Sequence, residues 1–362
     1  MTHVPAPSFR RGRHLQAGLT LIEFMVSIVI GMLMIAALAT LIANQSSTRS
    51  EIEKSGRMIE NGRYSINTMV NDVQLAGYWG ELSIQPAAPG ILPNPCTVAV
   101  AELQAAMGLH VQGYNAPATL PSDLAECVKE HKPGTDVLVV RRVDPDTSAM
   151  ETGGATDLGK VREGQVYLQT GLDVLGISVT SLVATGSDEG ATNTATFILT
   201  KKNKVSRAVL RKMVVDIYYV SKCSVPVGTS CTAGDNGNPI PTLKRVELDV
   251  SGDAPAFTTI TIAEGVENFQ VDYGVDTDSD GSPNGVDVDG SALTVADWPN
   301  VVTVKLHVLA RSSEASGGFT DSKKYAMGTA GEITPASGEL SYKRHAFVQS
   351  VRLVNPSSRR VL

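Results

Sequence analysis

The chain has 362 residues, of which 42% are hydrophobic, and its 31 Lys and Arg against 37 Asp and Glu give a net charge of -6. This composition excludes a disordered chain, and the absence of a long basic run argues against a nucleic-acid partner. A mean hydropathy of +0.01 does not exclude a membrane span, because one apolar segment disappears in the average.

An uncharged segment near the N-terminus is long enough to cross a bilayer. The twenty residues 24–43 carry no charge, and roughly 20 apolar residues span the hydrocarbon core. Arg10, Arg11 and Arg13 precede the segment, with no acidic residue in 1–18. The positive-inside rule therefore predicts a cytoplasmic N-terminus, with the rest of the chain in the periplasm or outside.

The start of this segment resembles the processing site of type IV prepilins. A short basic leader is followed by Gly18, Leu19, Thr20, Leu21, Ile22 and Glu23. The resemblance implies that residues 1–18 are a leader peptide, cut after Gly18 by a prepilin peptidase that then methylates the amine of Leu19. The family usually has phenylalanine where this chain has Leu19.

Glu23 is a lone carboxylate at the start of an apolar helix. A charged side chain is costly in the bilayer, so it is expected to have a partner. In the pilin family the partner is the N-terminal amine of a neighbouring subunit, and the resemblance implies this inter-subunit ion pair for Glu23. The alternative is a carboxylate that lies at the headgroup level and has no role in assembly.

Helical spacing continues beyond the apolar segment. Between Ile52 and Val73 apolar residues recur mostly every three or four positions, and no proline occurs from residue 19 to 85. This pattern predicts one continuous helix of about 55 residues that ends near Leu75, with Gly77 as the terminating residue. Residues 19–43 would be its transmembrane half and residues 44–76 its amphipathic half.

After Gly80 apolar and polar residues alternate, as in half-buried antiparallel strands. Runs bounded by Gly, Pro, Asn and Asp predict strands at 136–143, 165–170, 194–201, 209–220, 243–250, 266–273, 301–310 and 347–354. Loops or insertions are predicted at 101–123, 171–193 and 318–337. The predicted fold class is α+β, a pilin-like lollipop in which the long N-terminal helix carries a mainly antiparallel β head, residues 77–362.

The four cysteines form an even set in a compartment that the topology predicts to be oxidising, so disulfides are expected. They are Cys96, Cys127, Cys223 and Cys231. Three connectivities are possible, and proximity in the sequence favours Cys96 with Cys127 and Cys223 with Cys231. A zinc site is the alternative, but the chain has no CxxC pair and the nearest histidine, His131, stands alone.

The acidic loop, residues 276–287, has the ligand spacing of a calcium-binding EF-hand loop. Positions 1, 3, 5, 7, 9 and 12 are Asp276, Asp278, Asp280, Ser282, Asn284 and Asp287, with Gly281 at position 6. Aspartate in place of glutamate at position 12 predicts weak affinity, and a preceding strand predicts a loop-only, structural site. The alternative is a solvated turn whose four carboxylates repel one another without compensation.

Three further segments resemble the PilW group of minor pilins, namely 72–80, 265–273 and 344–355. The resemblance implies a structural pilin that helps to initiate type IV pilus assembly and sits at or near the pilus tip. Implied partners are other minor and major pilins, the prepilin peptidase, a pilus-tip adhesin of the PilY type and the inner membrane. The chain would cross the inner membrane once with its head in the periplasm, and would reach the extracellular tip on assembly.

Two other functions are compatible with these features. A minor pseudopilin of a type II secretion system shares the prepilin motif, and a calcium-dependent surface adhesin needs only a single-pass anchor. An enzyme is not predicted, because neither a GxSxG nor an HExxH motif occurs and the six histidines are scattered.

Overall fold

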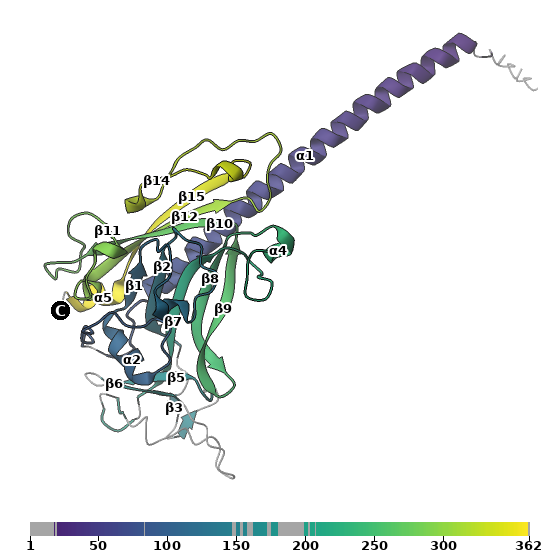
Figure 1. Ribbon diagram of the computed structural model, residues 1–362. Coiled ribbons are helices and arrows are strands. Elements are labelled where there is room, and N and C mark those ends of the chain that lie inside the picture. The colour runs from purple at the N-terminus through teal and green to yellow at the C-terminus, as the bar shows by residue number, and fades with distance from the viewer. Residues whose placement is uncertain are drawn as a thin grey trace, which may run out of the picture. The chain divides into compact units, whose positions relative to one another are not determined.

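The computed structural model describes residues 18, 20–82, 84–146, 150–152, 155–157, 162–171, 175–179, 199–201, 203–206 and 208–360 (Figure 1). The chain divides into two compact units, residues 1–53 and 54–362. In the first unit the described residues belong mainly to one long helix. The second unit contains the end of that helix and two main antiparallel sheets.

The helix α1, Leu21–Gln74, contains 54 residues and confirms the predicted continuous helix. After it, the N–H groups of Leu75 and Ala76 bond to carbonyls three residues back, which tightens the last turn. Gly77 then takes a φ of 70°, a conformation in which any side chain is strained. Its N–H donates to the carbonyl of Arg141 at 2.9 Å. The predicted glycine therefore ends the helix and leads the chain onto a sheet.

The larger sheet has seven strands and is centred on β7. Its strands are β1 Val111–Tyr114, β2 Val137–Val143, β5 Val166–Thr170, β6 Leu175–Val179, β7 Leu210–Ser221, β8 Thr242–Ser251 and β9 Ala254–Glu264. Strand β7 pairs with β2, β5 and β8, and β8 pairs with β9, which lies at an edge.

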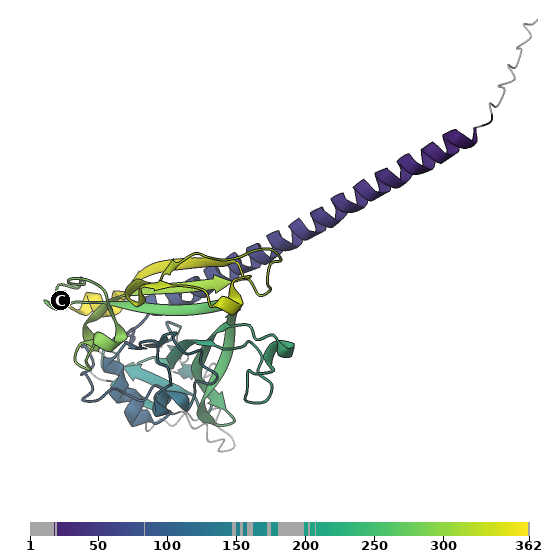
Figure 2. The ribbon, with the colours of Figure 1, turned by 45° about the horizontal axis from the view of Figure 1, so that its top comes forward.

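The second sheet has four strands in the order β11-β10-β12-β15, again antiparallel. Their bounds are β10 Val266–Val275, β11 Val288–Asp289, β12 Val301–Arg311 and β15 Arg344–Arg352. Figure 2 shows the light-green and yellow strands of this sheet as a layer over the teal and green strands of the larger one.

Short elements connect these strands. Two two-stranded pairs occur, β3 Met150–Thr152 with β4 Ala155–Asp157 and β13 Tyr325–Ala326 with β14 Glu332–Ile333. The short helices are α2 Val100–Ala105, α3 Ser122–Ala125, α4 Gly234–Gly237 and α5 Val354–Arg360, with 3-10 turns η1 Ala106–Gly108, η2 Gly290–Ala292, η3 Trp298–Asn300, η4 Gly328–Ala330 and η5 Ser337–Glu339.

Two hydrophobic clusters hold the second unit together. In the first, Met69 and Val73 of α1 pack with residues of both sheets, including Tyr218 of β7. The second cluster includes Ile217 and Tyr219 of the same strand. Successive side chains of a strand point to opposite faces, so β7 is buried on both of its faces. The end of α1 is therefore part of the core of the head.

Buried charges fix the connection 312–343 to the second sheet. The side chain of Arg344 is fully buried, and its Nη2 donates to Glu267 Oε1 at 3.1 Å while its Nη1 donates to Asp321 Oδ2 at 3.2 Å. The hydroxyl of Tyr325 donates to the same Asp321 oxygen at 2.9 Å. One guanidinium thus joins the start of β15, the start of β10 and the middle of the connection.

Most of the predicted strands are confirmed. The predictions at 136–143, 165–170, 209–220, 243–250, 266–273, 301–310 and 347–354 correspond to β2, β5, β7, β8, β10, β12 and β15, with ends that differ by three residues or fewer. For the prediction at 194–201, residues 194–198 lie outside the described residues. The predicted fold class, a long helix followed by a mainly antiparallel head, is confirmed.

The predicted loops are wrong where they contain regular structure. Residues 101–123 include most of α2, β1 and the start of α3, residues 171–193 include β6, and residues 318–337 include β13 and β14. A side chain at Gly113 of β1 would come within 2.0 Å of the Tyr273 hydroxyl, so this glycine serves close packing and not a turn. Strand β9 was not predicted, and all but one of its residues are partly buried or exposed, which weakens its alternating pattern.

Candidate functional site

At the start of α1, Thr20 and Glu23 cap the helix by hydrogen bonds to each other. The carboxylate of Glu23 accepts hydrogen bonds from the N–H and the hydroxyl of Thr20, each at 2.9 Å, and the N–H of Glu23 donates to that hydroxyl at 3.3 Å. This is a capping box, in which Thr and Glu three residues apart satisfy free N–H groups of the first turn. The Thr-x-x-Glu spacing signals it, but the sequence prediction gave Glu23 a partner only in a neighbouring subunit.

The predicted cleavage site lies between Gly18 and Leu19. Gly18 is exposed, and no described atom lies within 4 Å of the position that a side chain would take there. Leu19 lies outside the described residues.

The first half of α1 exposes a continuous apolar surface. Leu21, Met32 and Ile35 are 81%, 66% and 68% exposed. Among the described residues, α1 is the helix that is long and apolar enough to cross a membrane, with a mean hydropathy of 2.6 in its most apolar window. Apolar surface of this extent is stable in lipid or against other apolar helices.

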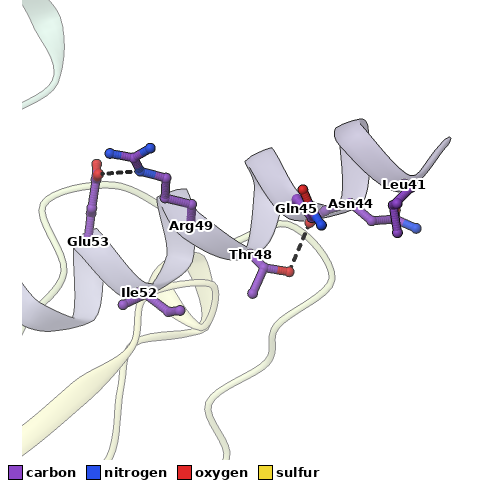
Figure 3. Close-up of a pocket in the computed structure, with 7 residues that line it drawn as sticks. All are labelled: Leu41, Asn44, Gln45, Thr48, Arg49, Ile52 and Glu53. Atoms are coloured by element: carbon purple, nitrogen blue, oxygen red, sulfur yellow. Dashed lines mark hydrogen bonds and ion pairs between the residues drawn. The ribbon is translucent and has the colours of Figure 1, made fainter. Parts of the chain in front are cut away.

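The surface of α1 changes character toward residue 53. Figure 3 shows one helix face lined by Leu41, Asn44, Gln45, Thr48, Arg49, Ile52 and Glu53. The Thr48 hydroxyl donates to the carbonyl of Asn44 at 2.9 Å, and Arg49 Nε lies 3.3 Å from Glu53 Oε1. Both charged side chains are more than half exposed, so the pair adds at most about 1 kcal/mol. An uncharged helix surface thus gives way to a charged, water-compatible one.

The four cysteines pair as sequence proximity favoured. Cys96 is bonded to Cys127 with a Cα–Cα distance of 5.6 Å, and Cys223 is bonded to Cys231 with a Cα–Cα distance of 5.5 Å. The first bond joins the segment before α2 to the end of α3, and the second closes a short loop between β7 and β8. Because all four sulfurs are in disulfides, the zinc alternative is wrong.

The acidic loop follows β10, as predicted, and brings three of its carboxylates together. Ligand oxygens of Asp276, Asp278 and Asp280 lie within 4.8 Å of one another, and a hard cation such as calcium prefers such oxygens. Asp276 is fully buried, and Asp278 and Asp280 are exposed. Among the described residues, these three carboxylates are close enough to one another to hold a metal ion.

The buried Asp276 already has several partners. It accepts hydrogen bonds from the N–H groups of Ser279 at 2.7 Å and Gly281 at 3.0 Å, and its Oδ2 lies 3.3 Å from Arg360 Nη1. Burial favours the protonated form, but these hydrogen bonds and the Arg360 charge outweigh it and hold the pKa of Asp276 below its ordinary value. Gly281 has a φ of 82°, which allows the turn that aims its N–H at the carboxylate.

Two of the remaining predicted ligands, Asn284 and Asp287, have other side-chain contacts. The side-chain oxygen of Asn284 accepts from the N–H of Thr277 at 2.6 Å, and Asp287 Oδ2 lies 3.5 Å from Lys305 Nζ. The N–H of Ser282 donates to Asp280 Oδ1 at 2.7 Å. A cation with the full predicted ligand set would have to displace some of these contacts.

In the solvated-turn alternative two of the four carboxylates are compensated, because Arg360 pairs with Asp276 and Lys305 with Asp287. Arg360 lies in α5 and Lys305 in β12, far from the loop in sequence. No local signal in the sequence identifies them as partners, since only the packing of these elements brings them to the loop.

Two regions of the chain match family models. Residues 13–39 match the model of the prokaryotic N-terminal methylation motif, and residues 217–355 match that of the type IV pilus-assembly protein W. Among solved structures, the type IV-like pilin TTHA1219 from Thermus thermophilus is similar over 54% of this chain and 85% of its own, with 15% identity and a TM-score of 0.23. Among curated proteins, none is significantly similar in sequence.

The matched regions contain most of the features described above. The first includes Gly18 and Glu23. The second begins within β7 and ends at Asn355, the second residue of α5, so it includes the acidic loop. Both the processing motif and the second sheet thus belong to regions with recognised relatives.

Proposed function

Because this chain is a PilW-type pilin with an N-terminal methylation motif, we propose that it is a structural minor pilin that helps to initiate type IV pilus assembly and sits at or near the pilus tip. The observation that supports this role best is the exposed apolar half of α1, which lies mostly within the matched motif. Pilins are structural proteins, and no catalysis is proposed for this chain.

The proposed path of the chain follows from its N-terminal half. The motif and the apolar helix fit a membrane-anchored pilin. The precursor would lie in the inner membrane with its head in the periplasm, be processed by the prepilin peptidase, and assemble with minor and major pilins. Partnership with a pilus-tip adhesin of the PilY type is part of the same proposal.

Deleting the gene and restoring it on a plasmid tests this function. We expect few or no pili on the deletion strain by electron microscopy, normal numbers after complementation, and immunogold label at pilus tips. Normal piliation with a loss of protein export would instead identify a type II secretion pseudopilin. The match to a pilus-assembly model favours the pilus over that alternative and over a free-standing adhesin.

Processing should depend on a small residue at position 18. Gly18→Ala should be cleaved partly, whereas Gly18→Glu should leave a precursor that is longer by the 18 residues of the leader, because a peptidase that reads a glycine has no room for a long charged side chain. Immunoblotting and N-terminal sequencing of the membrane-extracted protein measure this. A mature chain that begins anywhere other than Leu19 would contradict the prepilin assignment.

We also propose that the acidic loop binds calcium weakly, as a structural ion. Asp276, Asp278 and Asp280 would hold it, and the ion would supply positive charge that links the loop to the end of β10. Affinities of about 10⁻⁴–10⁻³ M are typical of extracellular modules, and the existing contacts of Asn284 and Asp287 favour this weak range.

Millimolar calcium should raise the melting temperature of the full chain in detergent, because a ligand that binds the folded state stabilises it in proportion to the logarithm of its concentration. Asp278→Ala combined with Asp280→Ala should remove the response, since both side chains are exposed and serve mainly the loop. Asp276 is unsuitable for this test, because its removal leaves Arg360 without its partner.

The control is Asp253→Ala, which removes an exposed carboxylate from the turn between β8 and β9 and should keep the calcium response. An unchanged melting temperature of the wild type in calcium would favour a loop neutralised by Arg360 and Lys305 alone.

Any soluble fragment used for such work should begin at or before residue 54, because Met69 and Val73 belong to the core.

A further inference from the structure

Among the described residues, strand β9 forms one long edge of the seven-stranded sheet and pairs only with β8. It pairs with β8 through residues 254–264, and no described residue pairs with its other edge. Figure 1 shows β9 at the outer side of the sheet beside β8. Residues 254–263 contain no charged side chain, although edge strands are usually protected from pairing by charges. From residue 256 onward this edge is therefore a template for one more strand, since Pro255 has no N–H to donate.

A pocket of about 490 Å³ lies on the same pair of strands. Lys244 of β8 and Thr261 of β9, which are direct partners in the sheet, both line it, as does Thr259. Its remaining walls include Tyr219 of β7 and the loop closed by the Cys223–Cys231 disulfide. Tyr219, Lys244 and Thr261 thus form a row across three neighbouring strands. A new strand beside β9 would add the next side chain to this row.

Lys244 is the informative residue of this pocket. It is only 7% exposed, and within the described part of the chain its ammonium group has neither a hydrogen-bond acceptor nor an ion-pair partner. Asp235 and Glu130 act on it only from a distance. Burial lowers the pKa of Lys244, because the charged form loses hydration that no contact replaces. A mostly buried lysine whose ammonium group opens into the pocket without a partner points to an anion supplied from outside.

The other charged groups around the pocket are already engaged. Glu130 pairs with Lys222 at 3.8 Å and accepts from the N–H of Cys231 at 3.4 Å, and Lys129 donates to the carbonyl of Ala125 at 2.6 Å. They leave Lys244 as the available binding charge.

The disulfide loop forms a preorganised wall. Asp235 accepts hydrogen bonds from the N–H groups of Ser224, Val225 and Ile240 at 2.7 to 2.9 Å, so both ends of the loop are held together. Beside the lining residues, Val225 and Val227 are 65% and 61% exposed. A rigid wall with an apolar rim can bury a partner's side chains at low conformational cost.

We propose that the open edge of β9 and the Lys244 pocket together form a docking site for an extended, carboxylate-bearing segment of a partner protein. The segment pairs with β9 through its backbone, as in β-strand addition. One of its Asp or Glu side chains passes over the short Thr261 and meets the ammonium group of Lys244. This site does not depend on the proposed role of the chain in a pilus.

The spacing of a sheet supports this arrangement. Neighbouring strands lie about 4.8 Å apart, so an added strand would place a side chain two strand positions, roughly 10 Å, from the backbone of Lys244. A lysine and a glutamate that extend toward each other cover this distance. Threonine at positions 259 and 261 leaves the space between them free, which a large side chain would fill.

The test uses the full chain in detergent with the peptide acetyl-Thr-Glu-Thr-Glu-Thr-amide and, as its uncharged match, the same peptide with glutamine for glutamate. Binding is measured by hydrogen–deuterium exchange of residues 254–264 over a peptide titration. We expect saturable protection of β9 by the glutamate peptide. Lys244→Met should weaken it roughly tenfold or more, the effect of losing one charge-assisted hydrogen bond, and Lys244→Arg should retain it.

A second pair of variants leaves the buried lysine in place. Thr261→Glu puts a carboxylate opposite Lys244 within the chain and should abolish peptide binding, whereas Thr261→Gln should not. Melting curves verify that each variant is folded, and Thr261 is exposed enough to be replaced. The proposal is overturned if millimolar glutamate peptide gives no protection of β9, if both peptides bind equally, or if folded Lys244→Met binds as the wild type does.

Discussion

Glu23→Ala should insert into the membrane as well as the wild type and yet fail to support piliation. Removing a carboxylate from an apolar helix makes insertion easier, while assembly loses the proposed ion pair with the N-terminal amine of the neighbouring subunit. Pili counted by electron microscopy, in cells that carry this variant as their sole copy, should be absent or rare. Membrane fractionation of the same cells should show normal amounts of protein.

The capping box adds a second reason for the loss, and two further variants separate the causes. Glu23→Gln keeps an oxygen that can accept from the N–H of Thr20 but removes the charge, so it should fail as Glu23→Ala does. Thr20→Val removes the hydroxyl that bonds to Glu23 and keeps the carboxylate, so it should assemble.

The opposite pattern, with Thr20→Val defective and Glu23→Gln active, would mean that Glu23 acts by starting the helix. Normal numbers of pili with Glu23→Ala would remove both roles. Both capping contacts of the carboxylate use Oε2, so Oε1 can meet the amine of a neighbouring subunit while the cap stays in place.

Arg344→Met should destabilise the head strongly. Breaking a buried ion pair by removing one partner costs about 3–5 kcal/mol, because the other charge stays buried without compensation. Here two carboxylates would lose the guanidinium group that pairs with them, namely those of Glu267 and Asp321, which are 7% and 1% exposed. Denaturant unfolding of the full chain in detergent, followed by tryptophan fluorescence, measures the change.

Lys324→Ala is the matched control. It also breaks an ion pair in the connection 312–343, to Glu332 at 3.2 Å, but both side chains are more than 60% exposed, and such pairs contribute about 0–1 kcal/mol. Similar losses in the two variants would contradict the role assigned to burial. Limited proteolysis should cut within 312–343 in Arg344→Met before the wild type is cut, because this residue anchors that connection.

The sequence determined the elements whose signals are local. Spacing by three or four residues, without a proline, was sufficient for α1, and Gly77 marked its end because a positive φ favours glycine. Alternation identified strands such as β8 and β12, where one set of side chains meets the core. The disulfides followed from an even number of cysteines and their proximity. The motif around Gly18 was recognisable for the same reason, since it lies within one short segment.

The tertiary structure alone decided which distant residues meet. Arg360 and Lys305 compensate the acidic loop, and Arg344 bridges two carboxylates, through contacts between segments separated by 18 to 84 positions. In the sequence, Lys244 is one polar residue of an alternating strand. Only the tertiary structure places it in a pocket beside the disulfide loop. A periodic pattern records which face of an element is buried, but not which element covers it, because that choice depends on packing energies summed over the whole chain.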